Sequence, residues 1–155
     1  MARREYFNDP DAPSANSIVV AATAFVQDES GRILLVRRSD NGLWAMPGGG
    51  MDVGERVADA VVRETREETG YGVEVVDLIG VYSDPAHVMA YDDGEVRQQF
   101  ALAFRCRLVE GEAQPSSETP ELRWATVEEL DHLEIHPSIR LRIGHGLNGP
   151  SLFIG

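Results

Sequence analysis

Short apolar runs alternate with polar turns along this chain, and the pattern predicts several β-strands. Small and β-branched residues fill positions 17–26, and the run ILLVRR at 33–38 begins with four apolar residues, with the turn-forming sequence QDESGR between the two runs. We therefore expect these two runs to form a hairpin. The sequence LWAMP that follows (43–47) predicts a short strand leading into three glycines.

Two longer runs in the middle of the chain also read as strands. Residues 73–82 include four valines, and the turn sequence DDGE follows at 92–95. Apolar and polar positions then alternate through 97–109, which predicts a strand with one apolar face. That face carries Phe100, Leu102, Phe104, Cys106 and Leu108. A last short strand is expected at 122–127.

One clear helical period lies between the glycines and the central strands, at 56–69. Its apolar positions have the spacing of one inward helical face, and they are Val57, Ala60, Val61 and Thr65. Gly70 stands where a left-handed residue would end the helix. Asp52 followed by Glu55 resembles a capping pair at its start.

The chain ends in two further helical patterns, at 127–130 and 137–147, the second predicted to stop near the glycines at 144–146. Residues 1–16 lack periodicity and read as an irregular N-terminal arm. The remaining residues, 17–155, form one predicted domain. Because strands precede and follow the central helix, we expect helices covering a mixed sheet, in an α/β or α+β arrangement.

The composition and net charge of the chain limit the classes of binding partner that it can have. The 155 residues include 26 acidic and 14 basic side chains, giving a net charge of −12, and every basic side chain is an arginine. The arginines are scattered, which argues against a nucleic-acid polymer as partner. The chain contains no run of 18 apolar residues, so the sequence predicts no membrane-spanning helix. The single cysteine forbids an intrachain disulfide, so we expect a cytoplasmic protein.

The predicted central helix carries an unusual concentration of negative charge. Glu64, Glu67 and Glu68 are three and four residues apart and so project to one side. A solvated helix face would explain such a cluster in an ordinary sequence. Here a glycine triplet precedes the helix, and the cluster offers only hard oxygen ligands. Such ligands suit Mg²⁺ or Mn²⁺, and Mg²⁺ commonly bridges to substrate phosphates.

The same residues resemble a known sequence motif. Gly49 is followed after five residues by Glu55, and after seven more by the run RETREETGY at 63–71. This spacing is that of the Nudix box, and the flanking sequences LLVRR, LWAMPGGG and ELRW are also similar to the family over residues 17–147. One departure is Thr65, where the family has a bulky aliphatic residue. We expect a small loss of core packing there and no loss of chemistry.

The resemblance implies a fold and a reaction. Nudix proteins have an α/β/α sandwich with a mixed β-sheet, and the box forms a loop–helix–loop. They hydrolyse a nucleoside diphosphate linked to another moiety, with Mg²⁺ as cofactor and Mn²⁺ as a substitute. By position, Glu67 and Glu68 are the expected main metal ligands. Glu64 is expected to be a further ligand or the base that takes a proton from water.

Other positions of the box imply supporting roles. Gly48 is expected to offer its backbone carbonyl to the metal ion. Glu55 and Arg63 are expected to brace the loop against the helix, and Gly49 and Gly70 to shape its two ends.

Residues outside the box complete the expected site. Glu118, six residues before a tryptophan, resembles the outlying metal-binding glutamate of one branch of the family, with Glu121 and Glu95 as rivals. Arg37 and Arg38 end a strand, and we expect one of them to face the phosphates. Alternation alone does not choose between them. None of the four histidines has a metal-binding spacing, so none is assigned as a ligand.

The substrate stays open at this level. Pro85 lies fifteen residues beyond the box, as in some relatives that cleave ADP-ribose. In the branch that cleans oxidised guanine nucleotides an asparagine near the last helix reads the base, whereas the corresponding segment here, EIHPSIR at 134–140, has no asparagine. The expected partner is a small nucleotide or nucleotide-sugar, and a homodimer is possible because dimers are the commonest assembly. The alternatives are a catalytically silent nucleotide-sensing module and a scaffold that uses the helix as an interaction surface.

Overall fold

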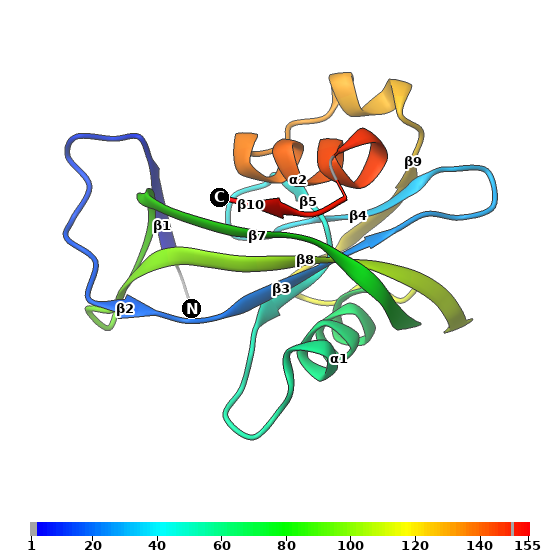
Figure 1. The fold of residues 1–155 in the computed structure, drawn as a ribbon, viewed down its shortest axis with the longest axis horizontal. Helices are drawn as coiled ribbons and strands as arrows, with labels where there is room; N and C mark the ends of the chain where they lie inside the picture. Colours follow the sequence, from blue (N-terminus) through cyan, green and yellow to red (C-terminus); the bar gives the residue numbers. More distant parts are fainter. Residues whose placement is uncertain (1–2, 150) are drawn as a thin grey trace.

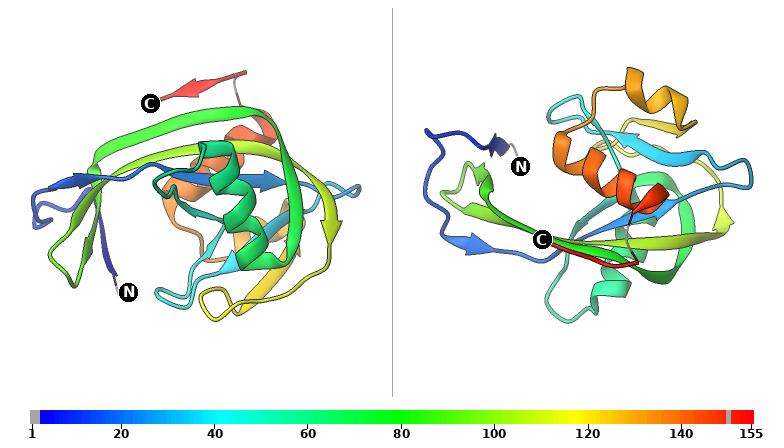
Figure 2. Two further views of the ribbon diagram at one scale, coloured as in Figure 1. Left: turned by 90° about the horizontal axis from the view of Figure 1, so that it is seen from below. Right: turned by 45° about the horizontal axis from the view of Figure 1, so that its top comes forward.

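The computed structural model describes residues 3–149 and 151–155. Within these residues, two α-helices lie on opposite faces of a large β-sheet, and a smaller sheet packs beside it (Figure 1, Figure 2). The large sheet contains β1 (Arg3–Phe7), β2 (Ser17–Ile18), β3 (Ala21–Val26), β6 (Gly48–Gly50), β7 (Tyr71–Tyr91), β8 (Val96–Gly111) and β10 (Phe153–Ile154). The small sheet contains β4 (Ile33–Arg37), β5 (Trp44–Ala45) and β9 (Glu121–Ala125).

The large sheet is mixed, as expected. Its main order is β1-β7-β8-β3-β6, with β10 added to β7 and β2 added to β8. β7 and β8 form a long antiparallel hairpin, whereas β3 runs parallel to β8 and antiparallel to β6. The helices that cover it are α1 (Val57–Thr69) and α2 (Pro137–Asn148). The predicted α/β sandwich is therefore confirmed.

The hydrophobic core lies on both faces of the sheet, because β3 is covered on each side. Ala24 and Val26 belong to the cluster under α1, whereas Phe25 belongs to the cluster under α2. Successive residues of a strand point to opposite faces, so a strand between two helices is apolar throughout. The same reasoning explains why 17–26 shows no polar alternation in the sequence.

The predicted central helix is confirmed, beginning one residue later than expected. Ala60, Val61 and Thr65 are all fully buried on its inner face. Gly70 ends the helix with φ +81°, a left-handed conformation that only glycine adopts at no cost. Glu55 does accept the backbone N–H of Asp52 at 2.8 Å, but it does so in the loop before the helix.

The predicted hairpin between 17–26 and 33–38 is wrong. A single bridge joins Gln27 and Ile33, and β3 and β4 then enter different sheets. Both hydrogen-bonding edges of β3 are already occupied, one by β8 and the other by β6. β4 pairs instead with β5 and β9.

Two predictions at the ends of the chain are also corrected. Residues Arg3–Phe7 are not irregular, because they form β1 along the edge of β7. The last helix does not stop at 144–146 but continues to Asn148. Gly146 lies there for packing: a Cβ on it would come within 2.6 Å of the Phe25 ring. The pattern at 127–130 becomes the 3-10 helix η1 (Glu128–His132).

Among the described residues, neither helix combines the length and the apolar character that crossing a membrane requires.

Candidate active site

The glycine-rich strand β6 allows the carboxylates of α1 to approach the backbone. The Gly48 N–H donates to Glu68 Oε1 at 3.0 Å. A Cβ on Gly49 would lie 2.5 Å from the Glu64 carboxyl carbon, so a larger residue would collide with that side chain. The glycines therefore let the loop close directly over two of the predicted ligands.

Thr65 fits the helix without an unpaired polar group. Its side chain is fully buried, and its hydroxyl donates to the Val61 carbonyl at 2.7 Å. The hydroxyl is thus satisfied within the helix, and the methyl group remains for packing. The departure from the usual motif residue leaves the helix intact.

Arg63 holds the loop against the helix. It donates to the Glu55 carboxylate at 2.7 and 3.0 Å and to the Gly50 carbonyl at 3.1 Å. It also contacts Glu64 at 3.0 Å and Glu67 at 3.2 Å. The bond from Arg63 lowers the pKa of Glu55 to about 2. One guanidinium therefore fixes the loop and offsets part of the negative charge on the helix.

Four carboxylates face one small hollow, which we call the carboxylate hollow. It is lined by Glu64, Glu67, Glu68, Ser116, Ser117 and Glu118. Glu118 reaches it from the loop before β9, which is anchored by a bond from Thr119 Oγ1 to the Glu68 carbonyl at 3.0 Å. The structure thus brings together the three predicted carboxylates of α1 and the predicted outlying glutamate.

Glu68 is the most buried of these acids, with 7% of its surface exposed. Burial raises its pKa to about 8, and the nearby charges of Glu64 and Glu118 add to this effect although the Gly48 N–H opposes it. Burial also raises the pKa of Glu64. The carboxylates therefore repel one another, and a cation between them would relieve this repulsion.

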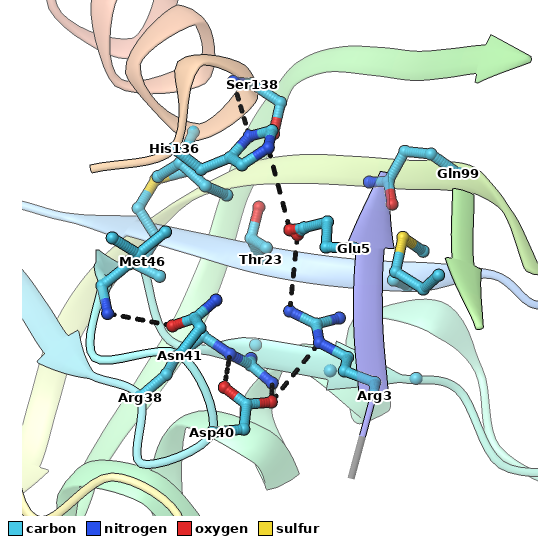
Figure 3. A pocket seen from close by; sticks show the side chains of 18 of the residues that line it. Arg3, Glu5, Thr23, Arg38, Asp40, Asn41, Met46, Gln99, His136 and Ser138 are labelled. Atoms are coloured by element: carbon cyan, nitrogen blue, oxygen red, sulfur yellow. Dashed lines mark hydrogen bonds and ion pairs between the residues drawn. The ribbon is translucent and has the colours of Figure 1, made fainter. Parts of the chain in front are cut away.

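A larger cavity of about 540 Å³ shares wall residues with the carboxylate hollow. Figure 3 shows part of the lining of this cavity. Glu64, Glu68 and Glu118 lie on its wall as well as on that of the hollow. Trp44 and Tyr91, two of the aromatic side chains that could stack on a nucleobase, also line it. A volume of this size is typical of small-molecule sites.

The structure distinguishes the two predicted arginines. Arg38 lines the cavity and forms two bonds to Asp40, at 2.9 and 2.7 Å. Arg37 donates instead to the Gly42 carbonyl at 2.9 Å and to Glu121 at 3.2 Å, away from the cavity lining.

The rival glutamates are also accounted for. Glu121 is engaged by a strand arginine, and Glu95 accepts from Arg97 at 2.8 and 3.0 Å. Neither lines the carboxylate hollow. Arg97 does line the large cavity, where its guanidinium lies 4.5 Å from the Tyr91 ring centroid.

Several cavity residues were not predicted from the sequence. Glu5 comes from β1, His87 from β7, and His136 caps the start of α2, and their side chains meet in the cavity wall. Arg142 adds a buried guanidinium from α2. These residues lie far apart in the sequence, and only the His-Pro pair at 136–137, a helix-start signal, marks any of them locally.

Comparison with known proteins agrees with this architecture. A model of the NUDIX domain matches residues 18–143. The chain is 38% identical over 128 residues to a MutT-like protein from Streptomyces ambofaciens, covering 81% of this chain and 75% of that protein. It is 31% identical over 123 residues to the nucleoside triphosphatase NudI of Enterobacter sp. (strain 638), covering 75% and 87% of the two chains.

A solved structure shows the same fold. An ADP-ribose pyrophosphatase from Streptococcus suis superposes with a TM-score of 0.69 and 25% identity, over 90% of this chain and all of that one. The match of the family model extends over most of the chain and includes every carboxylate of the hollow. On this evidence, the chain belongs to the Nudix hydrolase family.

Proposed function

We propose that this protein is a Mg²⁺-dependent pyrophosphohydrolase that cleaves a nucleoside diphosphate linked to another moiety. The observation that carries the proposal is the adjacency of the carboxylate hollow to the large cavity, with Glu64, Glu68 and Glu118 on the walls of both. A substrate in the cavity would present its phosphates to these acids. Arg38 lies on the same wall as a cationic contact for them.

The residues of the hollow fit a divalent cation. Glu64, Glu67, Glu68 and Glu118 supply carboxylate oxygens. Gly48 lines the adjoining large cavity, and its carbonyl is a further candidate ligand. Hard oxygen donors of this kind suit Mg²⁺, with Mn²⁺ as a substitute. The raised pKa of Glu68, about 8, supports the fit because it reports a buried acid that lacks a cationic partner strong enough to keep it ionised.

The reaction adds water to a phosphorus atom and breaks the bridging P–O bond, and the leaving phosphate takes the bond electrons. A bound divalent cation would neutralise charge on the phosphates and lower the pKa of a bound water. In our proposal Glu64 either contributes to the cation site or accepts the proton from water. Arg63 and Glu55 hold the loop in position, and Arg38 orients the phosphates.

The names of the similar proteins indicate substrates that consist of a nucleoside diphosphate with a second group attached. The similar proteins include a nucleoside triphosphatase and ADP-ribose pyrophosphatases. We propose a free nucleotide or a nucleotide-sugar as substrate. A cytoplasmic location and a homodimer stay predictions from the sequence.

A substrate panel tests the proposal. Nucleoside triphosphates, ADP-ribose and nucleotide-sugars are incubated with the protein and Mg²⁺, and the products are identified by chromatography. We expect turnover of at least one substrate, and a loss of about a hundredfold or more in Glu67→Gln and Glu68→Gln. Glu110→Gln is the matched control, since Glu110 pairs with Arg66 at 2.8 Å, outside the hollow.

Two outcomes oppose the proposal. Equal turnover by the two variants and the wild type would remove the assigned roles from the helix. Tight binding of ADP-ribose with no turnover under Mg²⁺ or Mn²⁺ would instead identify a nucleotide-sensing module.

A further inference from the structure

The unpartnered buried polar groups of this protein gather in one place. Among residues 3–149 and 151–155, four buried side-chain atoms lack a hydrogen-bond partner: Arg3 Nε, Thr23 Oγ1, His87 Nε2 and Arg142 Nε. All four residues line the large cavity. An unpaired buried polar group is costly, so such groups usually have a partner. Arg3 Nε and His87 Nε2 each have a carboxylate at 3.4 and 3.5 Å, on Asp40 and Glu5, whereas Thr23 Oγ1 and Arg142 Nε have neither a hydrogen bond nor an ion pair. Buried donors with long or missing contacts on one cavity wall are suited to bonding with a polar ligand.

Glu5 provides the acceptor among these groups. Its carboxylate lies 3.5 Å from His87 Nε2. It also lies 3.8 Å from His136 Nε2 and 3.9 Å from an Arg3 Nη atom, and Figure 3 shows these two side chains on either side of Glu5. Burial alone would raise its pKa, but these three neighbours outweigh burial and hold the pKa at about 2. Each separation is longer than an ordinary hydrogen bond. Because its pKa is low, the Glu5 carboxylate is ionised. Because its three contacts are long, its oxygens can still accept short hydrogen bonds from a ligand.

A metal ion is a poor fit for this cluster, although its donor atoms lie within 4.8 Å of one another. His136 Nδ1 accepts the backbone N–H of Ser138 at 3.1 Å, so the neutral ring carries its proton on Nε2, facing Glu5. The rings of His87 and His136 are stacked with centroids 4.8 Å apart and planes 11° apart. Lone pairs in two nearly parallel planes do not converge on one ion. The histidines instead surround the Glu5 carboxylate.

Arg142 provides the complementary donors. It is 3% exposed, and its guanidinium carbon lies 5.1 Å from the centroid of the Tyr82 ring. Burial lowers its pKa to about 10, so it keeps its charge at neutral pH. A guanidinium presents its N–H groups as a planar fork that matches a pair of acceptors. The cavity therefore offers a carboxylate and a guanidinium to the same ligand.

We propose that Glu5 and Arg142 recognise the guanine base of a nucleotide bound in the large cavity, an inference that rests on the proposed function. Guanine has two adjacent donors, N1–H and the N2 amino group, which match the two oxygens of a carboxylate. Its O6 and N7 acceptors match a guanidinium fork. Adenine, cytosine and uracil each lack the adjacent pair of donors. Glu5 and Arg142 are thus specificity-determining residues.

Binding of nucleoside monophosphates tests this inference without requiring turnover. The affinities of GMP, IMP and AMP for the full chain are measured by calorimetry; IMP differs from GMP only by lacking the N2 amino group. We expect GMP to bind about tenfold or more tightly than IMP, since the amino group bonds to a charged acceptor. In Glu5→Gln this ratio should fall to near one, with IMP affinity changed much less.

Two further variants sharpen the test. Glu74→Gln is the matched control, because Glu74 pairs with Arg107 and does not line the cavity. It should keep the wild-type GMP-to-IMP ratio. Arg142→Met should lower the affinity for GMP and IMP together relative to AMP, because both share O6. Circular dichroism establishes that each variant is folded, and if Arg142→Met fails to fold, Glu5→Gln alone decides.

The outcomes separate this inference from the proposed function. Equal affinity of the wild type for GMP and IMP, or an unchanged ratio in Glu5→Gln, would overturn the assignment of guanine even if the protein hydrolyses nucleotides. A clear preference for GMP without turnover of any nucleotide would support guanine recognition and refute the proposed hydrolysis.

Discussion

Replacing Glu68 with glutamine should stabilise the metal-free protein while removing its activity. Glu68 is buried, and its pKa is raised from the ordinary value of 4.5 to about 8 by burial and by the charges of Glu64 and Glu118. Between these two pH values the folded state binds more protons than the unfolded state. The free energy of unfolding therefore falls as the pH rises from 4.5 to about 8, because Glu68 loses its proton more readily in the unfolded protein than in the folded protein.

The size of the effect follows from the pKa difference. Integrated from pH 5 to pH 8, linkage gives a loss on the order of 3 kcal/mol for the wild type. For a protein of 155 residues this corresponds to a fall in melting temperature of roughly 6–12 °C. Glu68→Gln avoids the loss, because a neutral amide keeps the shape, and its oxygen can still accept the Gly48 N–H.

Thermal unfolding followed by circular dichroism measures this effect. In EDTA at pH 8, Glu68→Gln should melt above the wild type, and the difference should shrink towards pH 5. Adding Mg²⁺ should raise the melting temperature of the wild type at pH 8 much more than that of the variant. The cation would neutralise the buried Glu68 carboxylate of the wild type, which the variant lacks. The exposed-site variant Glu110→Gln should follow the wild type. If Glu68→Gln melts below the wild type in EDTA at pH 8, the interpretation of the hollow as a strained cation site is wrong.

Three further predictions concern the wall of the site and the core. Gly49→Ala should lower kcat by about tenfold or more, because its Cβ would displace the Glu64 carboxylate, and steady-state hydrolysis measures this. Arg38→Met should raise KM by about tenfold while Arg37→Met leaves it unchanged, since only Arg38 lines the cavity. Burial raises the pKa of the Cys106 thiol to about 12, so this thiol should resist a disulfide reagent in buffer and react quickly in urea.

The parts of the fold that were predictable depend on neighbours in the sequence. The helical period at 56–69 and the glycine that ends it are local signals, and both appear in the structure. The pairing of β3 is not local, because its edges are occupied by β6 and by β8, which lies far along the chain. An apolar run followed by a turn and a second apolar run could not show that the second strand enters another sheet.

The candidate site divides in the same way. Three of its carboxylates lie within five residues on one helix, so their spacing alone brought them together. Glu5, His87 and His136 come from three separate elements, and no spacing rule relates them. The four histidines have no metal-binding spacing in the sequence, whereas the structure places two of them around a carboxylate. The sequence could therefore group the acidic residues of one helix, but it could not group cavity residues that come from separate strands and helices.

The proposed binding of polyphosphate by a protein with a net charge of −12 depends on how the arginines of the cavity are partnered. Asp40 occupies Nε and one Nη of Arg38, and the same carboxylate lies 3.4 Å from Arg3 Nε. A guanidinium has five N–H groups, so two bonds to Asp40 leave three for phosphate oxygens. Asp40 thereby fixes the plane of Arg38 without filling its donors, which reduces the conformational entropy that phosphate binding would otherwise cost. Asp40 therefore orients the arginine donors more than it neutralises their charge. Removing Asp40 should weaken phosphate binding, although it removes a negative charge.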